Sequence, residues 1–188
     1  MAEEDEAEEG VAQPAARAEI KRKVVLVGDG AVGKTSLIRN FVLDMFDDKY
    51  IMTIGTKVSK KEVELKFYES DIKMTLMIWD ILGQKGYQFV QWEGFKFSYG
   101  AFMVCDITRR ETLDSLNSYW IPELRKIVHD IPFVFLANKC DLAADAQVKE
   151  DELRAVATKY NSSYYLTSAK TGQGVKDAFH KLAEIALL

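Results

Sequence analysis

Residues 28–35 read GDGAVGKT, and their spacing fits the phosphate-binding pattern G-x-x-x-x-G-K-[ST]. The glycines allow the backbone to curl so that consecutive N–H groups face inward and form a concave anion site, and a helix that begins there adds the positive end of its dipole. In this pattern Lys34 reaches the outer phosphates of a nucleotide, and the Thr35 hydroxyl ligates Mg²⁺. We therefore expect a nucleoside triphosphate to contact Gly30, Ala31, Val32, Gly33, Lys34, Thr35 and Ser36.

The flanking sequence decides between this interpretation and an ordinary glycine-rich turn. The apolar run Val24–Val27 precedes the loop and is typical of a strand buried on both faces of a parallel sheet. After the loop, apolar residues recur at three- and four-residue spacing, as in an amphipathic helix: Leu37, Ile38, Phe41 and Val42. A strand before and a helix after is the context that the pattern requires. The loop alone specifies neither the base nor the reaction.

A second motif, Asn138-Lys139-Cys140-Asp141, follows the apolar run Phe133–Ala137. It therefore lies at the carboxyl end of a predicted strand, where open α/β sheets bind ligands. The Asp141 carboxylate can accept hydrogen bonds from N1–H and the 2-amino group of guanine. Adenine would leave that carboxylate unpaired, and sites of this kind discriminate strongly. We expect Asn138 either to bind the base or to tie this loop to the phosphate loop, and the stem of Lys139 to cover the base plane.

A third segment supports the same assignment. Ser168, Ala169 and Lys170 follow the last predicted strand, and a backbone amide there can bind the guanine oxygen. This tripeptide is weak evidence by itself, and residues 138–141 taken alone could be an ordinary polar loop between a strand and a helix.

Residues for sensing the terminal phosphate follow the apolar stretch Ile72–Trp79. We expect Asp80 to hold a water molecule on Mg²⁺, the Gly83 N–H to contact the terminal phosphate and Gln84 to orient the attacking water. Thr53 is a candidate second hydroxyl ligand of Mg²⁺, although a threonine in a loop is usually just a loop residue. The predicted catalytic residues are thus Gln84 and Lys34.

The elements that position these residues alternate between strands and helices. Strands are predicted at 24–27, 58–68, 72–79, 101–107, 133–137 and 163–167, and the alternation of Val63, Leu65 and Phe67 with charged residues favours a half-exposed edge strand. Helices are predicted after the phosphate loop and at 111–129, 150–160 and 175–187, with Pro122 restarting or bending its helix. This order predicts an α/β sheet with helices on both faces.

Composition limits the other function classes. Residues 1–20 contain seven acidic residues and one basic residue, whereas the whole chain has a formal net charge of −4, so residues 21–188 are slightly positive. We expect residues 1–20 to be a disordered acidic tail, either merely solvating or partner-binding. Without a basic stripe, nucleic acid is not an expected partner. Two distant cysteines favour a reducing, cytoplasmic setting, and no apolar run is long enough to span a membrane.

In their order and spacing, these motifs resemble the Ras superfamily of small GTPases over residues 21–188, and residues 50–55 and 78–80 look most like the Rab branch. The resemblance implies a P-loop G-domain, with a six-stranded, mostly parallel sheet, five helices and two switch segments at about 47–57 and 80–96. It implies that Phe46 lies against the guanine and that Tyr50 covers the phosphates, although Phe46 alone would be interpreted as core. It also implies effector, exchange-factor and GTPase-activating partners.

The sequence departs from that family at several positions. Ile81 and Leu82 replace smaller residues, Lys85 replaces the usual glutamate after Gln84, and Val58 replaces an aromatic residue common in Rab proteins. Gly30 is retained, so no side chain there crowds Gln84. The chain ends at Leu188 without a cysteine for lipid attachment. We therefore expect no direct membrane anchor in this chain, and membrane contact only through partners.

The predicted reaction is in-line attack of water on the γ-phosphate of GTP. Arg39, Arg109 and Arg110 lie on or near helices outside any motif, so no arginine is expected to act on the phosphates in cis, and hydrolysis should be slow. Tyr87, Phe89, Trp92, Phe95 and Phe97 form either a partner surface or core. The alternatives are a GTP-binding scaffold that does not hydrolyse GTP and an ATP-dependent kinase, against which residues 138–141 argue.

Overall fold

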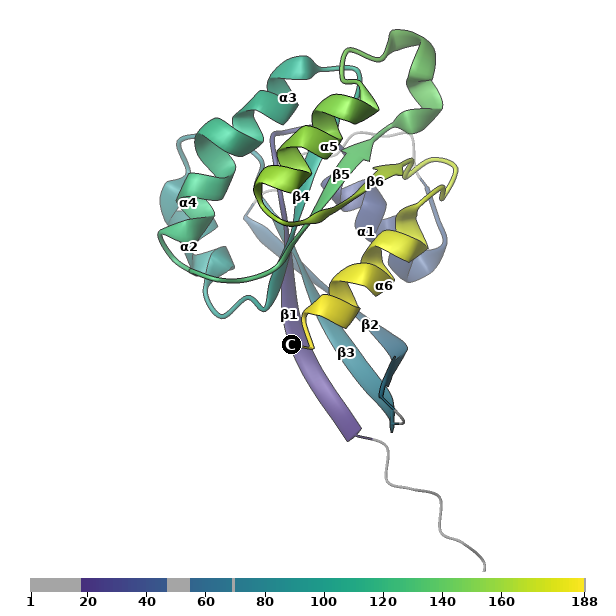
Figure 1. Cartoon of the computed structure of the whole chain (residues 1–188). Helices are drawn as coiled ribbons and strands as arrows, with labels where there is room; N and C mark the ends of the chain where they lie inside the picture. Colours follow the sequence, from purple (N-terminus) through teal and green to yellow (C-terminus); the bar gives the residue numbers. More distant parts are fainter. Residues whose placement is uncertain (1–17, 47–54, 69, 188) are drawn as a thin grey trace, which may run out of the picture.

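The computed structural model describes residues 18–46, 55–68 and 70–187, and these contain one six-stranded sheet (Figure 1). Its strand order is β2-β3-β1-β4-β5-β6, and only β2 runs antiparallel to its neighbour. The strands are β1 (Ala18–Val27), β2 (Thr56–Phe67), β3 (Ser70–Ile81), β4 (Gly100–Asp106), β5 (Phe133–Asn138) and β6 (Ser163–Thr167). All six predicted strands are therefore confirmed, with β1 beginning earlier than the apolar run indicated.

Helices follow most of the strands. They are α1 (Lys34–Leu43), α2 (Gln88–Phe95), α3 (Arg110–Ser115), the π-helical turn η1 (Leu116–Trp120), α4 (Ile121–Arg125), the 3₁₀ helix η2 (Cys140–Asp145), α5 (Glu150–Lys159) and α6 (Val175–Ile185). Because α3, η1 and α4 are continuous, residues 110–125 form one helical segment. The described part of the chain thus has the five expected helices and the short η2.

Two apolar clusters cover the two faces of the sheet. Helices α1 and α6 pack on one face, and α2, α3, α4 and α5 pack on the other (Figure 1). Side chains of β1 alternate between them: Val24 and Leu26 belong to the first cluster, Val25 and Val27 to the second. All four are fully buried, because a parallel strand covered on both faces must be apolar on both. This explains the continuous apolar run before the phosphate loop.

Other expectations need correction at their boundaries. β1 begins at Ala18, so residues 18–20 belong to a strand and not to the predicted tail, whose first 17 residues lie outside the described part. The helix predicted over 111–129 ends at Arg125. Pro122 lies in the first turn of α4, directly after the π-helical turn, so the predicted irregularity is present. A proline lacks the N–H that a regular helix would use there.

The edge strand β2 shows the predicted alternation. Val63 and Leu65 are buried against the first cluster, while the charged residues between and beside them are exposed.

β1, β4, β5 and β6 are parallel, so the segments that follow these strands all emerge at one edge of the sheet, the one formed by the carboxyl ends of the strands. The segments that follow these strands carry residues 28–33, 139–141 and 168–170, while Asn138 ends β5 and Asp80 lies at the end of β3. Among the described residues, the phosphate loop, the segments 138–141 and 168–170 and Asp80 therefore meet at this edge.

Candidate nucleotide-binding site

The phosphate loop leads directly from β1 into α1. Gly33 occupies the N-cap of α1 with a φ of 100°, in the left-handed region that favours glycine. A Cβ atom at Gly33 would also lie 2.2 Å from Nδ2 of Asn138. Glycine is therefore required both by the turn and by the close approach of the second motif. The first N–H groups of α1 are left at the loop, as an anion site requires.

Lys34 is held beneath the loop. Its side chain is 6% exposed, and Nζ donates hydrogen bonds to the carbonyl oxygens of Gly28 (2.7 Å) and Asp29 (2.8 Å). Burial lowers the pKa of Lys34 to about 8, against an opposing effect of the nearby Asp80 and Asp29 carboxylates. A phosphate bound beside this ammonium group would stabilise its positive charge and so offset the cost of burial.

Thr35 and Asp80 lie side by side as predicted for a Mg²⁺ site. The Thr35 hydroxyl donates a hydrogen bond to Oδ2 of Asp80, whose side chain is 1% exposed. Both residues line a hollow of about 140 Å³ between α1 and β2. A hydroxyl and a carboxylate are the hard oxygen groups that Mg²⁺ prefers, and Mg²⁺ usually keeps several waters. These two residues therefore fit the predicted ion, whereas Thr53 lies outside the described residues.

Asn138 joins the second motif to the phosphate loop. Its side chain is 1% exposed, and Nδ2 donates to the carbonyl of Val32 (2.8 Å). Its Oδ1 accepts hydrogen bonds from the Ala169 N–H (3.1 Å) and the Thr167 hydroxyl (3.4 Å). Of the two roles considered for Asn138, the structure thus shows the connection between loops. Three segments that are far apart in the sequence are fixed to one another by this single side chain.

Asp141 is exposed, but its carboxylate is held. The Ser168 hydroxyl donates to Oδ1 of Asp141 over 2.6 Å, and Ser168 is fully buried. The backbone N–H of Ser168 donates to Gln173 (3.0 Å), and that of Ala169 is engaged by Asn138. To bind a base, the N–H of Ser168 or of Ala169 would have to share its hydrogen with the acceptor that it already has. The third residue of this segment, Lys170, is exposed. The carboxylate thus has one oxygen fixed by the protein and faces solvent.

The backbone at Gly83 passes so close to the phosphate loop that a side chain there would have no room. A Cβ atom at Gly83 would lie 2.4 Å from Nζ of Lys34 and 2.7 Å from the carbonyl oxygen of Asp29. At Gly30, by contrast, a Cβ atom would meet only the Gly83 carbonyl oxygen, at 3.7 Å. Only a residue without a side chain allows the backbone after β3 to come this close to the loop.

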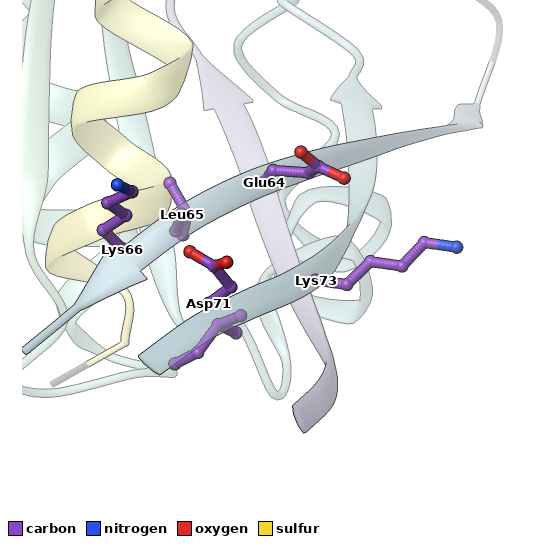
Figure 2. A pocket seen from close by; sticks show the side chains of 6 residues that line it. Glu64, Leu65, Lys66, Asp71 and Lys73 are labelled. Atoms are coloured by element: carbon purple, nitrogen blue, oxygen red, sulfur yellow. The ribbon is translucent and has the colours of Figure 1, made fainter. Parts of the chain in front are cut away.

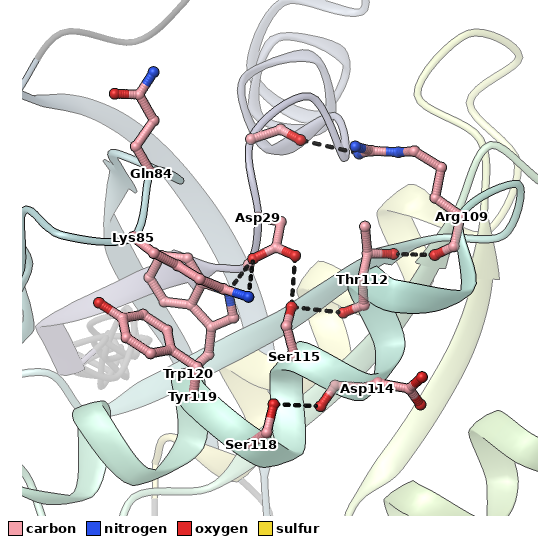
Figure 3. Close-up of polar contacts among 12 residues, drawn as sticks. Asp29, Gln84, Lys85, Arg109, Thr112, Asp114, Ser115, Ser118, Tyr119 and Trp120 are labelled. Atoms are coloured by element: carbon pink, nitrogen blue, oxygen red, sulfur yellow. Dashed lines mark hydrogen bonds and ion pairs between the residues drawn. The ribbon is translucent and has the colours of Figure 1, made fainter.

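Gln84 is half-buried, and its carbonyl oxygen accepts a hydrogen bond from Nε2 of Gln91 (2.7 Å). In Figure 3 the side chain of Gln84 points away from Asp29 and Lys85. Gln91 is fully buried in α2, and its Oε1 accepts a hydrogen bond from the Tyr119 hydroxyl (3.1 Å). The backbone at Gln84 is thus tied to the helical segment 110–125.

The departures from the family pattern have structural partners. Leu82 is buried, with 7% of its side chain exposed. Nζ of Lys85 lies 3.8 Å from Oδ1 of Asp29 and over the Tyr119 ring (Figure 3). Asp29 also accepts hydrogen bonds from the Trp120 indole N–H (2.7 Å) and the Ser115 hydroxyl (2.5 Å). In this chain the second predicted switch segment therefore contacts the phosphate loop through Lys85.

Sequence reasoning missed two residues of the site, Asp106 and Arg109. The Asp106 carboxylate, 1% exposed, lies 2.6 Å from Nζ of Lys139 and 3.1 Å from Nε of Arg109. Lys139 thus reaches Asp106, with its backbone in the left-handed region. A signal was present, because Asp106 ends the buried strand β4 and pairs in register with Asn138.

The predicted aromatic surface divides between the two alternatives. Tyr87, Phe89 and Phe97 are exposed, whereas Phe95 is fully buried and Trp92 is half-buried. Phe46 is 38% exposed and is not core, so the interpretation from the sequence alone is wrong. Tyr50, expected over the phosphates, lies outside the described residues, as does most of the first predicted switch segment.

Another hollow, of about 340 Å³, lies on the β2–β3 hairpin (Figure 2). It is lined by acidic and basic side chains and two apolar residues: Glu64, Leu65, Lys66, Asp71, Ile72 and Lys73. These residues pair with one another near the hairpin turn, at the opposite end from Thr56 and Ile81. This hollow is therefore separate from the loops that carry the motifs.

In the part of the chain that the structure describes, no helix combines the length and apolar character needed to cross a membrane. In comparison with known protein families, residues 23–187 match the Ras family. The chain is 36% identical to the Ras-related protein Rab-2B of Dictyostelium discoideum, covering 86% of this chain and 78% of that protein. It is 33% identical to Rab-21 of Geodia cydonium (89% and 72% covered) and 31% identical to Rab-13 of Canis lupus familiaris (88% and 80%). The family match and these relatives show that the chain belongs to the Ras family and is a Rab-like small GTPase.

Proposed function

We propose that this small GTPase binds GDP and GTP with Mg²⁺ and hydrolyses GTP slowly, so that it alternates between two nucleotide states. The observation that carries the proposal is the position of Asp141. Its carboxylate is held by Ser168, and the neighbouring Asn138 is bonded to the phosphate loop. A guanine on Asp141 and phosphates on residues 28–35 would therefore occupy one rigidly connected site.

The chemistry assigned to each residue follows from its place in this site. Lys34 and the loop amides stabilise charge on the outer phosphates. Gln84 orients the attacking water, and the Gly83 N–H contacts the terminal phosphate. Thr35, Thr53 and, through water, Asp80 would hold Mg²⁺, and the ion would supply positive charge that offsets the charge of the phosphates. Without an arginine supplied by a partner, turnover should be on the order of 10⁻⁴ to 10⁻³ per second.

The partners and location of the protein are part of the proposal. Effectors, exchange factors and GTPase-activating proteins would contact the segments 47–57 and 80–96, whose order depends on the γ-phosphate. The exposed Tyr87 and Phe89 of the second segment suit such contacts. We expect the protein to act in the cytoplasm and to reach membranes through partners.

Turnover of GTP by the full chain tests the proposal. Phosphate release should be specific for GTP over ATP, should need Mg²⁺ and should fall in the Gln84→Leu variant. A Gln88→Leu variant, which changes a half-buried residue at the start of α2, is the matched control and should keep most of the rate. Tight GTP binding with equal, near-zero rates in the wild type and Gln84→Leu would favour the alternative, a GTP-binding scaffold. Preference for ATP would contradict both.

A further inference from the structure

Arg109 reaches the phosphate loop from the connection between β4 and α3. It is the N-cap residue of α3 and has an extended backbone, with a φ of −137°. Its Nη2 donates a hydrogen bond to the carbonyl oxygen of Gly30 (2.9 Å), 79 residues earlier in the chain (Figure 3). No motif in the sequence assigns a role to this arginine.

A buried carboxylate holds Arg109 in this position. Oδ2 of Asp106 accepts the Nε–H of Arg109 (3.1 Å) and lies 2.6 Å from Nζ of Lys139. Oδ1 accepts hydrogen bonds from the Thr108 N–H (3.0 Å) and hydroxyl (2.8 Å). Burial opposes the charge of Asp106, but the bonds from Lys139 and Thr108 prevail and keep its pKa below the usual value. The carboxylate thus stays ionised and fixes both cations.

The bond to Gly30 acts on one peptide group of the loop. In a trans peptide the carbonyl of Gly30 and the N–H of Ala31 point to opposite sides of the chain. Ala31 has a φ of 61°, a left-handed conformation that is unfavourable for a residue with a side chain. The guanidinium of Arg109, bonded to the Gly30 carbonyl, therefore holds the Gly30–Ala31 peptide in this unfavourable conformation. The bond also polarises this peptide group, which strengthens the Ala31 N–H as a donor.

We propose that Arg109 is a positioning residue of the nucleotide site: it fixes the Gly30–Ala31 peptide with the Ala31 N–H toward the phosphates, and Asp106 couples it to Lys139 at the base-binding end. This rests on the proposed function. The neighbouring Arg110 provides a contrast, because it contacts Glu152 and Asp114 and not the loop. Of the two consecutive arginines, Arg109 thus contacts the phosphate loop and Arg110 contacts α5 through Glu152.

Equilibrium competition with a fluorescent GDP analogue tests this in the full chain, using GDP and GMP as competitors. GMP shares the base but lacks the β-phosphate, which the outer part of the loop would bind. Arg109→Ala should weaken GDP binding about tenfold and GMP binding by less than about twofold. Arg109→Lys keeps the charge but cannot bond Asp106 and Gly30 in the same geometry, so it should lose about threefold for GDP. Arg110→Ala should leave both affinities within about twofold.

The thermal midpoint of each variant separates positioning from unfolding. If Arg109→Ala does not fold, the ratio of GDP to GMP affinity in Arg109→Lys and Arg109→Gln supplies the same comparison. Equal losses for GDP and GMP, no loss for GDP, or the same loss in Arg110→Ala would overturn the role of Arg109. A wild-type chain that binds neither nucleotide would overturn the proposed function itself, which is a different result.

Discussion

The side-chain amide of Gln91 donates a hydrogen bond to the backbone carbonyl of Gln84 over 2.7 Å, so a fully buried residue of α2 fixes the segment that carries the predicted catalytic glutamine. The same Nε2 lies 3.4 Å from the carbonyl oxygen of Leu82. One donor thus holds the turn after β3 at two points. The Tyr119 hydroxyl fixes the other end of the amide.

Replacing Gln91 by glutamate should test this bond. Glu keeps the shape and the acceptor for Tyr119, but its carboxylate would face the carbonyl oxygens of Leu82 and Gln84 without a donor. We expect the free energy of unfolding to fall by about 1–3 kcal/mol and GTP hydrolysis to slow, measured by urea titration and phosphate release at pH 8. Tyr119→Phe, which removes only one hydroxyl, should cost about 0.5–1.5 kcal/mol. Unchanged stability and rate in Gln91→Glu would show that the bond does not hold Gln84.

Gly83→Ala and Gly30→Ala should differ sharply. A Cβ atom at Gly83 would lie 2.4 Å from Nζ of Lys34 and 2.7 Å from the Asp29 carbonyl, so the loop or the lysine must move. We expect overpacking of about 1–3 kcal/mol and weaker GDP binding. At Gly30 the nearest atom would be 3.7 Å away, so stability should change by less than about 0.5 kcal/mol. Thermal unfolding and GDP titration measure both; equal behaviour of the two variants would contradict the packing described.

Asp141→Asn should reduce selection for the 2-amino group of guanine. GDP and IDP differ only in that group, so the wild type should bind GDP much more tightly than IDP. In Asp141→Asn the difference should shrink, because an amide cannot accept both hydrogens as a carboxylate does. Ser168→Ala removes the hydrogen bond that holds the Asp141 carboxylate and should have a smaller effect of the same kind, worth about 1–2 kcal/mol. An unchanged ratio in Asp141→Asn would remove Asp141 from the base site.

Lys34 gives the nucleotide-free protein a pH dependence of known sign. Burial lowers its pKa in the folded chain from 10.5 to about 8, so between these values the unfolded chain binds more protons than the folded one. Stability should therefore rise as pH increases from 8 towards 10.5, by up to about 3 kcal/mol. Lys34→Met should lose the part of the rise in stability that Lys34 contributes.

Lys23 also has a pKa lowered to about 8 and adds a similar pH dependence. Because Lys23 is present in both the wild type and Lys34→Met, the difference between their pH dependences reports Lys34 alone. Urea unfolding at pH 7.5, 8.5 and 9.5 measures the slope. Identical slopes for the wild type and Lys34→Met would contradict the burial of an ionisable Lys34.

The sequence predicted the parts of the site that depend on local patterns. Val24–Val27, Gly33 and Lys34 form a strand, a turn and a helix start within a dozen residues, so spacing alone locates them. Asn138 was placed at a strand end by its apolar neighbours, although its bond to Val32 came from tertiary structure. The fold follows from the same alternation of strands and helices.

The rest depends on contacts between distant segments. Arg109 meets Gly30 only because β4 lies beside β1 in the sheet, and no local pattern reports that pairing. Asp106 looks like the polar end of a buried strand until the register with Asn138 is known. Phe46 has an apolar side chain, which suggested core, yet it is more than one-third exposed.

The central claim is that Asp141 and the phosphate loop form one guanine-nucleotide site, and comparing the equilibrium affinities of the nucleotide-stripped chain for Mg²⁺-GDP and Mg²⁺-ADP tests it most directly. We predict that GDP binds at least ~10³-fold more tightly, because adenine would leave the carboxylate without its two donors. Equal affinities, or tighter binding of ADP, would contradict the account.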